Sequence, residues 1–185
     1  MNNGTNQQYD AAVLSCRDIF LKKTRDYGTS WRVLRTISIA DQLFIKARRI
    51  RTLQEVSEQR VEEDKAGEFR AMVNYGVIGL IQLSIPGGAS IEDMPAVDAE
   101  KWYDEKITRA RMTMLDKNHD YGEAWRDMSQ ESFVDLILMK ILRIRQIVAN
   151  EGKTLISEGI DSNYIDIINY SLFALILIAE GKHSG

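Results

Sequence analysis

The chain has 185 residues, 44% of them hydrophobic and 28% charged, with a formal net charge of −3, which is typical of one globular domain or two small halves and gives no sign of a nucleic-acid-binding surface. The single cysteine, Cys16, excludes an internal disulfide framework, so we expect a cytoplasmic protein. The polar first residues lack the apolar region of a signal peptide, and the longest apolar run, at 171–179, is shorter than the roughly 20 residues that span a membrane.

Helical signals follow one another along the whole chain. Apolar residues recur at helical spacing, and the two prolines, Pro86 and Pro95, lie close together. In chain order, this pattern predicts helices at about 9–25, from 38, through 69–83, at about 99–118, from 132 and through 164–178. The proline- and glycine-rich segment predicts a linker at 86–97, between a first repeat at 1–85 and a second repeat at 98–185.

The two halves are copies of one unit. A shift of 94 residues aligns 9–51 with 103–145 without a gap, and 16 of these 43 positions are identical. Because chance does not give such a match, we infer a tandem duplication. A single unit would expose its apolar helix faces. We therefore expect an all-α fold in which two three-helix units pack as one pseudo-twofold helical bundle.

Two local signals predict where the helices end and begin. Gly28 and Gly122 follow the repeated Asp-Tyr pair, and each predicts a left-handed helix stop. The pattern Ser-x-x-Asp occurs at 38–41 and at 132–135, and predicts a capping box at the start of the second helix of each unit.

A pair of cations recurs on the second helix of each unit. Lys140 and Arg143 lie three residues apart among apolar neighbours, and Lys46 and Arg49 repeat them. Two donors on one face of a rigid helix are typical of a phosphate clamp. Snorkelling cations or structural ion pairs explain the same spacing equally well, so both interpretations stay open.

The third helix of the second half carries Asp166 and Asn169 at i, i+3 among apolar residues. A carboxylate buried there is costly unless it pairs with a cation or a metal, and Mg²⁺ prefers oxygen ligands. The alternative is that Asp166 points to solvent or forms an ion pair with Lys140 or Arg143. The first half has Ala71 at the position of Asp166, so we expect the acidic function to occur once.

These motifs follow one another in an order that resembles a known family. Lys-x-x-Asp-Tyr-Gly, Lys-x-x-Arg and Asp-x-x-Asn-Tyr together resemble the nucleotide-modification-associated domain 1 family. The second half supplies KNHDYG at 117–122, KILR at 140–143 and DIINY at 166–170. The first half supplies KTRDYG at 23–28, KARR at 46–49 and VNY at 73–75.

The motif order is also similar to the all-α NTP pyrophosphatases of the MazG and dimeric dUTPase type. Those enzymes hold Mg²⁺ on acidic helix positions and split a nucleoside triphosphate between its α and β phosphates. Their Glu-Glu-x-x-Glu helix corresponds here to DLILMKILR, in which Asp135 is the only acid. The resemblance therefore implies either Mg²⁺-dependent hydrolysis of a (modified) nucleoside triphosphate or a non-catalytic nucleotide-binding or helical scaffold protein.

These motifs and the resemblance together give a set of candidate site residues. Asp166 and Asp161 would be catalytic, and both would hold Mg²⁺ together with Glu158. The expected partner is a nucleotide or another phosphorylated small molecule, with no membrane or nucleic-acid partner and with homo-oligomer formation left open. The candidate substrate-binding residues are Lys140, Arg143, Asp120, Tyr121, Trp125, Asn169, Tyr170, Lys46, Arg49, Asp26 and Tyr27.

Overall fold

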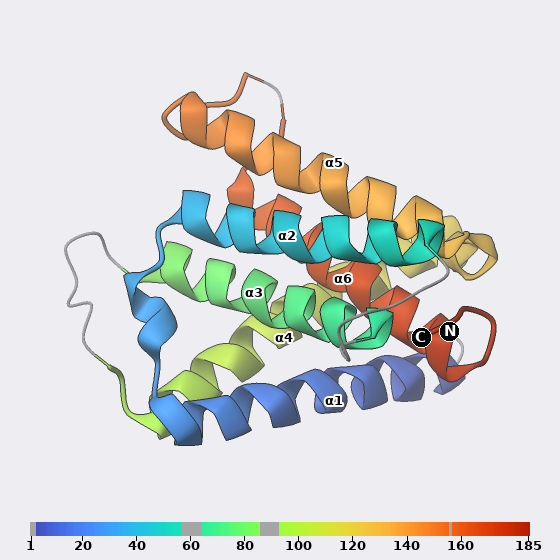
Figure 1. Cartoon of the computed structure of the whole chain (residues 1–185), viewed down its shortest axis with the longest axis horizontal. Coiled ribbons are helices and arrows are strands. Elements are labelled where there is room, and N and C mark those ends of the chain that lie inside the picture. Colours follow the sequence, from blue (N-terminus) through green and yellow to red (C-terminus); the bar gives the residue numbers. More distant parts are fainter. Residues whose placement is uncertain (1–2, 57–63, 86–92, 156) are drawn as a thin grey trace.

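The computed structural model describes residues 3–56, 64–85, 93–155 and 157–185, and within these ranges the chain is helical (Figure 1). The elements, in chain order, are α1 (Asn3–Tyr27), η1 (Ser30–Val33), α2 (Thr36–Glu55), α3 (Lys65–Ser84), α4 (Ala96–Tyr121), η2 (Ala124–Asp127), α5 (Gln130–Ala149) and α6 (Ile160–Ala179). The order of three long helices and one 3-10 turn therefore occurs twice. This confirms the predicted all-α class and the three-helix unit. Most of the expected linker at 86–97 lies outside the described residues, and α4 begins within its expected end.

The repeated glycines end the first helix of each unit as predicted. Gly122 has φ 63° and ψ 34° and caps α4, and its N–H donates to the Asn118 carbonyl at 2.9 Å. Gly28 has φ 70°, and its N–H donates to the Thr24 carbonyl at 2.8 Å. Glycine adopts positive φ at little cost. In both repeats the backbone can therefore turn directly from the first helix into the 3-10 turn that carries the tryptophan.

The predicted capping boxes are wrong. Arg35, not Ser38, precedes α2, and no side chain caps that helix start. The N-cap of α5 is Ser129, whose hydroxyl accepts from the N–H of Ser132 at 3.1 Å. Each helix thus begins before the Ser-x-x-Asp pattern, because Ser and Asp also tolerate the first turns of a helix. Asp41 instead pairs with Arg145 across the α2–α5 contact, at 2.7 Å.

The two repeats face each other about a pseudo-twofold axis. Figure 1 shows α2 beside α5, α3 beside α6, and α1 with α4 on the opposite side of the molecule. Reciprocal ion pairs join α1 and α4, because Arg17 binds Asp104 at 2.7 Å and Arg111 binds Asp10 at 2.8 Å. These partners are equivalent residues in the two repeats. A contact in which i meets j and j meets i is the signature of twofold symmetry.

A second reciprocal pair is buried. The Tyr9 hydroxyl donates to Asn169 at 2.7 Å, and the Tyr103 hydroxyl donates to Asn74 at 2.8 Å. Each asparagine in turn donates to a carbonyl of the first helix in its own repeat. Burial raises the pKa of both tyrosines, so their hydroxyls remain donors. These bonds fix the first helix of one repeat on the third helix of the other.

The core lies where α3 crosses α6. Two glycines of α3 make this close approach possible. A Cβ at Gly76 would lie 2.7 Å from Ile168, and one at Gly79 would lie 2.5 Å from the Tyr164 ring. By length and composition α6 alone, among the described residues, passes the test for a membrane span, but 78% of its apolar window is buried inside the molecule. A buried core helix passes the same test.

Candidate functional site

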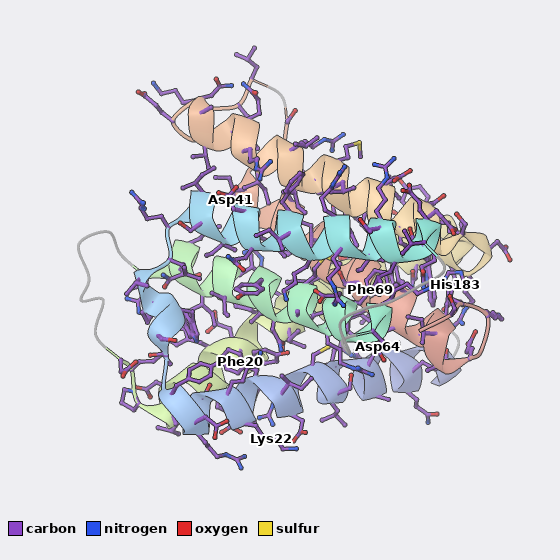
Figure 2. All side chains as sticks on the ribbon, viewed as in Figure 1. Phe20, Lys22, Asp41, Asp64, Phe69 and His183 are labelled. Atoms are coloured by element: carbon purple, nitrogen blue, oxygen red, sulfur yellow. The ribbon has the colours of Figure 1, made fainter. Side chains whose placement is uncertain are left out.

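The first repeat encloses a cavity of about 360 Å³ between α1, η1, α2 and α3. Figure 2 shows Phe20 on the inner side of α1, whereas Lys22 points away from the bundle. The inner residues of the same helix reach the cavity because they lie three or four positions apart. The charged and aromatic side chains of the lining are Lys23, Lys46, Arg70, Glu68, Phe20, Tyr27, Trp31 and Tyr75.

A buried carboxylate, Glu68, holds the repeated cations of the first half. Its side chain is 2% exposed, and it binds Arg49 at 2.6 Å and lies 3.4 Å from the Lys46 ammonium. Two cations offset the cost of burying this charge. The sequence interpretation missed Glu68 because Asn163 aligns with it in the second repeat. Its position one helical turn before Ala71, on the same face, was the available signal.

In the second repeat, Asp166 holds the equivalent lysines. Its two oxygens lie 2.8 Å from Lys117 and 2.8 Å from Lys140, and its side chain is 10% exposed. The alternative of an ion pair with Lys140 is therefore what the structure shows. Burial opposes the charge on Lys117, but its hydrogen bond to Asp166 raises the pKa of this lysine above the usual range. The triad keeps a net charge of +1, but each ammonium group has a carboxylate oxygen as its partner.

Equivalent lysines of the first repeat lack this carboxylate. Lys23 and Lys46 correspond to Lys117 and Lys140, but Ala71 replaces Asp166. Lys23, Lys46 and Ala71 all line the cavity. Within the part of the chain that the structure describes, Lys23 forms no ion pair. A small side chain thus leaves both space and positive charge where the second repeat has its own acid.

The two repeated tryptophans also differ. Trp125 stacks on Phe173 with ring centroids 4.2 Å apart, and Arg126 covers it. Its indole N–H donates to Asn118 at 3.2 Å. Trp31 lines the cavity instead and is 8% exposed, and its indole nitrogen has no hydrogen-bond partner among the described residues. Of the two tryptophans, only Trp31 is placed to contact a ligand in this cavity.

Other predicted site residues lie apart from the cavity. Tyr121 is 74% exposed, and Asp120 faces solvent beside His119. Arg143 is exposed and contacts Met139, so it does not join Lys140 on Asp166. The side chain of Asn169 accepts a hydrogen bond from Tyr9 and donates one to a carbonyl of α4. Burial raises the pKa of Tyr170, which lies near Asp166. Of the predicted residues, Tyr27 and Lys46 line the cavity, and Arg49 binds Glu68, which also lines it.

The proposed magnesium ligands do not assemble. Across 3–56, 64–85, 93–155 and 157–185, no three Asp, Glu, His or Cys side chains lie close enough to hold a metal ion. Asp161 pairs with Arg109 at 2.6 Å, Glu158 is exposed, and both oxygens of Asp166 face ammonium groups. Since Mg²⁺ requires oxygen donors that are free to bind it, this donor set does not fit the ion.

Comparison with known proteins gives a family. The family model described as nucleotide modification associated domain 1 matches residues 23–83 and again residues 117–178. No curated protein matches the chain. No solved structure matches it either. Each matched segment lies within one structural repeat, from the end of its first helix to its third helix, and the two together cover more than half of the chain. The chain therefore belongs to the nucleotide modification associated domain 1 family, and it carries that domain twice.

Proposed function

We propose that this protein binds a nucleotide in the cavity of the first repeat. One observation carries the proposal. In the second repeat, an oxyanion, the Asp166 carboxylate, lies between Lys117 and Lys140 at 2.8 Å from each. In the first repeat, the equivalent lysines line a cavity, with Ala71 in place of the acid. An oxyanion of the ligand would take the place that Asp166 takes in the second repeat.

The charge of the lining favours an acidic ligand. Lys23, Lys46 and Arg70 line the cavity with a single carboxylate, Glu68, which is already paired with Arg49 and Lys46. A phosphate group accepts several charge-assisted hydrogen bonds and so suits clustered cations better than a neutral group does. The positive cavity also lies in a chain of net charge −3, so the attraction is local to this site.

The aromatic side chains favour a flat group attached to that acid. Tyr27 is 54% exposed and Tyr75 is half-buried, and both line the cavity with Trp31. Rings of this kind stack on nucleobases, because every base has a flat π-face. The description of the family agrees with a nucleotide as ligand. A non-catalytic binding protein is the form supported here, since the acidic side chains of the described residues offer no set of ligands for Mg²⁺.

Calorimetry on matched lysine variants tests the proposal. The ligands are a panel of nucleoside 5′-monophosphates and triphosphates with the corresponding nucleosides. We expect Lys23→Gln to weaken phosphorylated ligands about tenfold to a hundredfold, because a charge-assisted hydrogen bond contributes roughly 1.5–3 kcal/mol. Nucleoside affinity should change little. The Tm should hold, because Lys23 has no ion pair among the described residues.

Lys117→Gln is the control, because it removes the equivalent lysine of the second repeat. It leaves Asp166 with one partner and should lower the Tm while nucleotide affinity stays unchanged. If no nucleotide binds the wild-type protein, or if both variants weaken binding equally, the proposal is wrong. A helical scaffold protein is then the remaining interpretation.

A further inference from the structure

Arg70 is a cation of the first repeat that the second repeat lacks. The equivalent residue is Ile165, which precedes Asp166 just as Arg70 precedes Ala71. Arg70 lines the cavity of the first repeat. In the described part of the chain its guanidinium forms no ion pair, and its one side-chain hydrogen bond is the 3.4 Å contact from Nε to the Ser15 hydroxyl. The two terminal nitrogens of the guanidinium therefore keep their donors for water or a ligand.

The guanidinium of Arg70 lies beside the lysines of this cavity. Ser15, which it contacts, and Lys23 are two turns apart on α1. Side chains on a helix tilt toward its N-terminus, so Lys23 extends back along α1 toward Ser15. Lys46 of α2 meets Glu68, which lies two residues before Arg70 on α3. Cations from three helices thus line the same part of the cavity.

Arg70 also lines a second cavity, of about 320 Å³, between α1 and α6. Among the described residues around that cavity, the other charged side chain is the carboxylate of Glu180, which pairs with Arg126 at 2.9 Å. An anion would be repelled by Glu180 there, whereas Lys23 and Lys46 would attract it in the first cavity. An anionic partner of Arg70 is therefore expected in the first cavity.

The number of cations indicates which acidic group fits. In the second repeat, the two oxygens of the Asp166 carboxylate each bind one lysine, at 2.8 Å. The first repeat adds Arg70 to the equivalent lysines, so a group with a third terminal oxygen would give each cation an oxygen of its own. A phosphate monoester has three terminal oxygens, whereas a carboxylate or a phosphodiester has two. The charge agrees, because three cations and the Glu68 carboxylate give the described lining a net charge of +2, and a phosphate monoester carries about −1.5 to −2 at pH 7.

We propose that this cavity binds the terminal phosphate of a nucleotide, and that Arg70 selects such a phosphate over a phosphodiester. The planar guanidinium donates to phosphate oxygens from its terminal nitrogens, while Lys23 and Lys46 bind the remaining oxygens. This inference rests on the proposed function. It narrows the ligand class to nucleotides with a free terminal phosphate, and it excludes cyclic nucleotides, whose phosphate has two terminal oxygens and one negative charge.

Calorimetry with open and cyclic nucleotides tests the selection. The probes are AMP, GMP, CMP and UMP, each as the 5′-monophosphate and as the 3′,5′-cyclic monophosphate. We expect the wild-type protein to bind the open forms about tenfold more tightly. Arg70→Ile gives the first repeat the residue of the second, and should weaken the open forms about tenfold and the cyclic forms much less, because it removes charge-assisted hydrogen bonds. The Tm should hold, since Arg70 forms no ion pair among the described residues.

Arg48→Leu is the matched control. Arg48 is exposed on α2 and does not line the cavity, and the equivalent residue of the second repeat is likewise aliphatic, Leu142. This variant removes the same charge and should change the affinity of neither form. If Arg70→Ile lowers the Tm, Arg70→Gln, which keeps a polar side chain, takes its place in the same comparison.

Three outcomes overturn the assignment. The wild-type protein binds the cyclic forms as tightly as the open ones, or Arg70→Ile weakens both forms equally or neither, or Arg48→Leu has the same effect as Arg70→Ile. Ribose 5-phosphate separates this inference from the proposed function. If it shows the same dependence on Arg70 and binds as tightly as the nucleotides, the selection of a terminal phosphate stands and the nucleobase is not recognised. If the wild-type protein binds none of the nucleotides, the proposed function itself fails.

Discussion

In the first repeat Lys23 and Lys46 line a cavity and only Lys46 pairs with a carboxylate, that of Glu68, whereas in the second repeat both equivalent lysines bind the carboxylate of Asp166. The helix packing of the two repeats matches. Equivalent tyrosines donate hydrogen bonds to equivalent asparagines, and equivalent arginines form ion pairs with equivalent aspartates. The difference lies at single positions on α3 and α6. Asp166 corresponds to Ala71, and Asn163 corresponds to Glu68 one turn earlier. A shift of the acid by one turn thus decides whether the carboxylate binds both lysines, as Asp166 does, or only one of them, as Glu68 does.

This comparison also explains why both repeats are retained in one fold. The third helix of each repeat binds the first helix of the other through a buried hydrogen bond. Each unit thus completes the core of its neighbour, whatever happens at its own lysine pair. The second repeat can lose an open cavity without loss of the bundle. The proposed ligand site therefore lies in the first repeat.

The largest expected loss of stability follows from removal of the Asp166 carboxylate in the second repeat. Asp166→Asn leaves Lys140, which is 13% exposed, without its counter-charge. We expect a loss of about 3 kcal/mol in the free energy of unfolding in chemical denaturation, since a buried pair that loses one partner costs roughly 3–5 kcal/mol and Lys117 is half exposed. Nucleotide affinity should not change. Lost binding with unchanged stability would place the site in the second repeat instead.

The reverse substitution should close the first repeat. Ala71→Asp puts a carboxylate where Asp166 stands in the second repeat, within reach of Lys23 and Lys46. We expect nucleotide affinity to fall about a hundredfold, roughly 2.7 kcal/mol, because the new acid competes for both lysines and repels the phosphate. The measurement is calorimetry, with Ala71→Asn as a control of nearly the same size as Ala71→Asp and no charge. Equal affinities for the two variants would refute the equivalence of the two lysine sites.

The duplication in the sequence predicts most of the fold. Residues 9–51 match 103–145 without a gap, and Gly28 and Gly122 correctly mark the helix ends. The starts of α2 and α5 are not predicted, because Ser and Asp near a helix start are compatible with several cap positions. Helical spacing also identifies the repeated lysines, whose contacts with carboxylates the structure shows.

The site itself is only partly visible in the sequence. An alignment compares equal positions, so it misses that Glu68 and Asp166 serve equivalent lysines from positions one turn apart. The cavity depends on the small side chain of Ala71. An alanine in a sequence does not by itself indicate a binding site. The unpaired N–H of Trp31 depends on the partner that Thr24, the residue equivalent to Asn118, does not provide. These features require the packed structure.

The two equivalent tyrosine–asparagine hydrogen bonds predict a smaller loss of stability, equal for the two repeats. Tyr9→Phe and Tyr103→Phe each remove one buried hydroxyl bond and leave an asparagine oxygen without its donor. We expect each variant to lose about 1–2 kcal/mol in the free energy of unfolding, and the two losses to agree within about 0.5 kcal/mol. Chemical denaturation measures both. A large loss at one tyrosine alone would show that the two pseudo-twofold-related hydrogen bonds contribute unequally to stability.

The smallest effect should be that of Asp161, which lies outside both lysine sites. The hydrogen bond from Arg109 holds the pKa of Asp161 below its ordinary value of 3.8. A lowered pKa in the folded state means that the pair stabilises the protein above about pH 4, and that this contribution disappears as the pH falls through the folded pKa. Both side chains are more than a third exposed, so Asp161→Asn should cost under about 1 kcal/mol at pH 7 and less at pH 2. Urea denaturation at the two pH values measures the difference. A cost at pH 7 as large as that of Asp166→Asn would mean that the pair is not the simple surface contact that its exposure indicates.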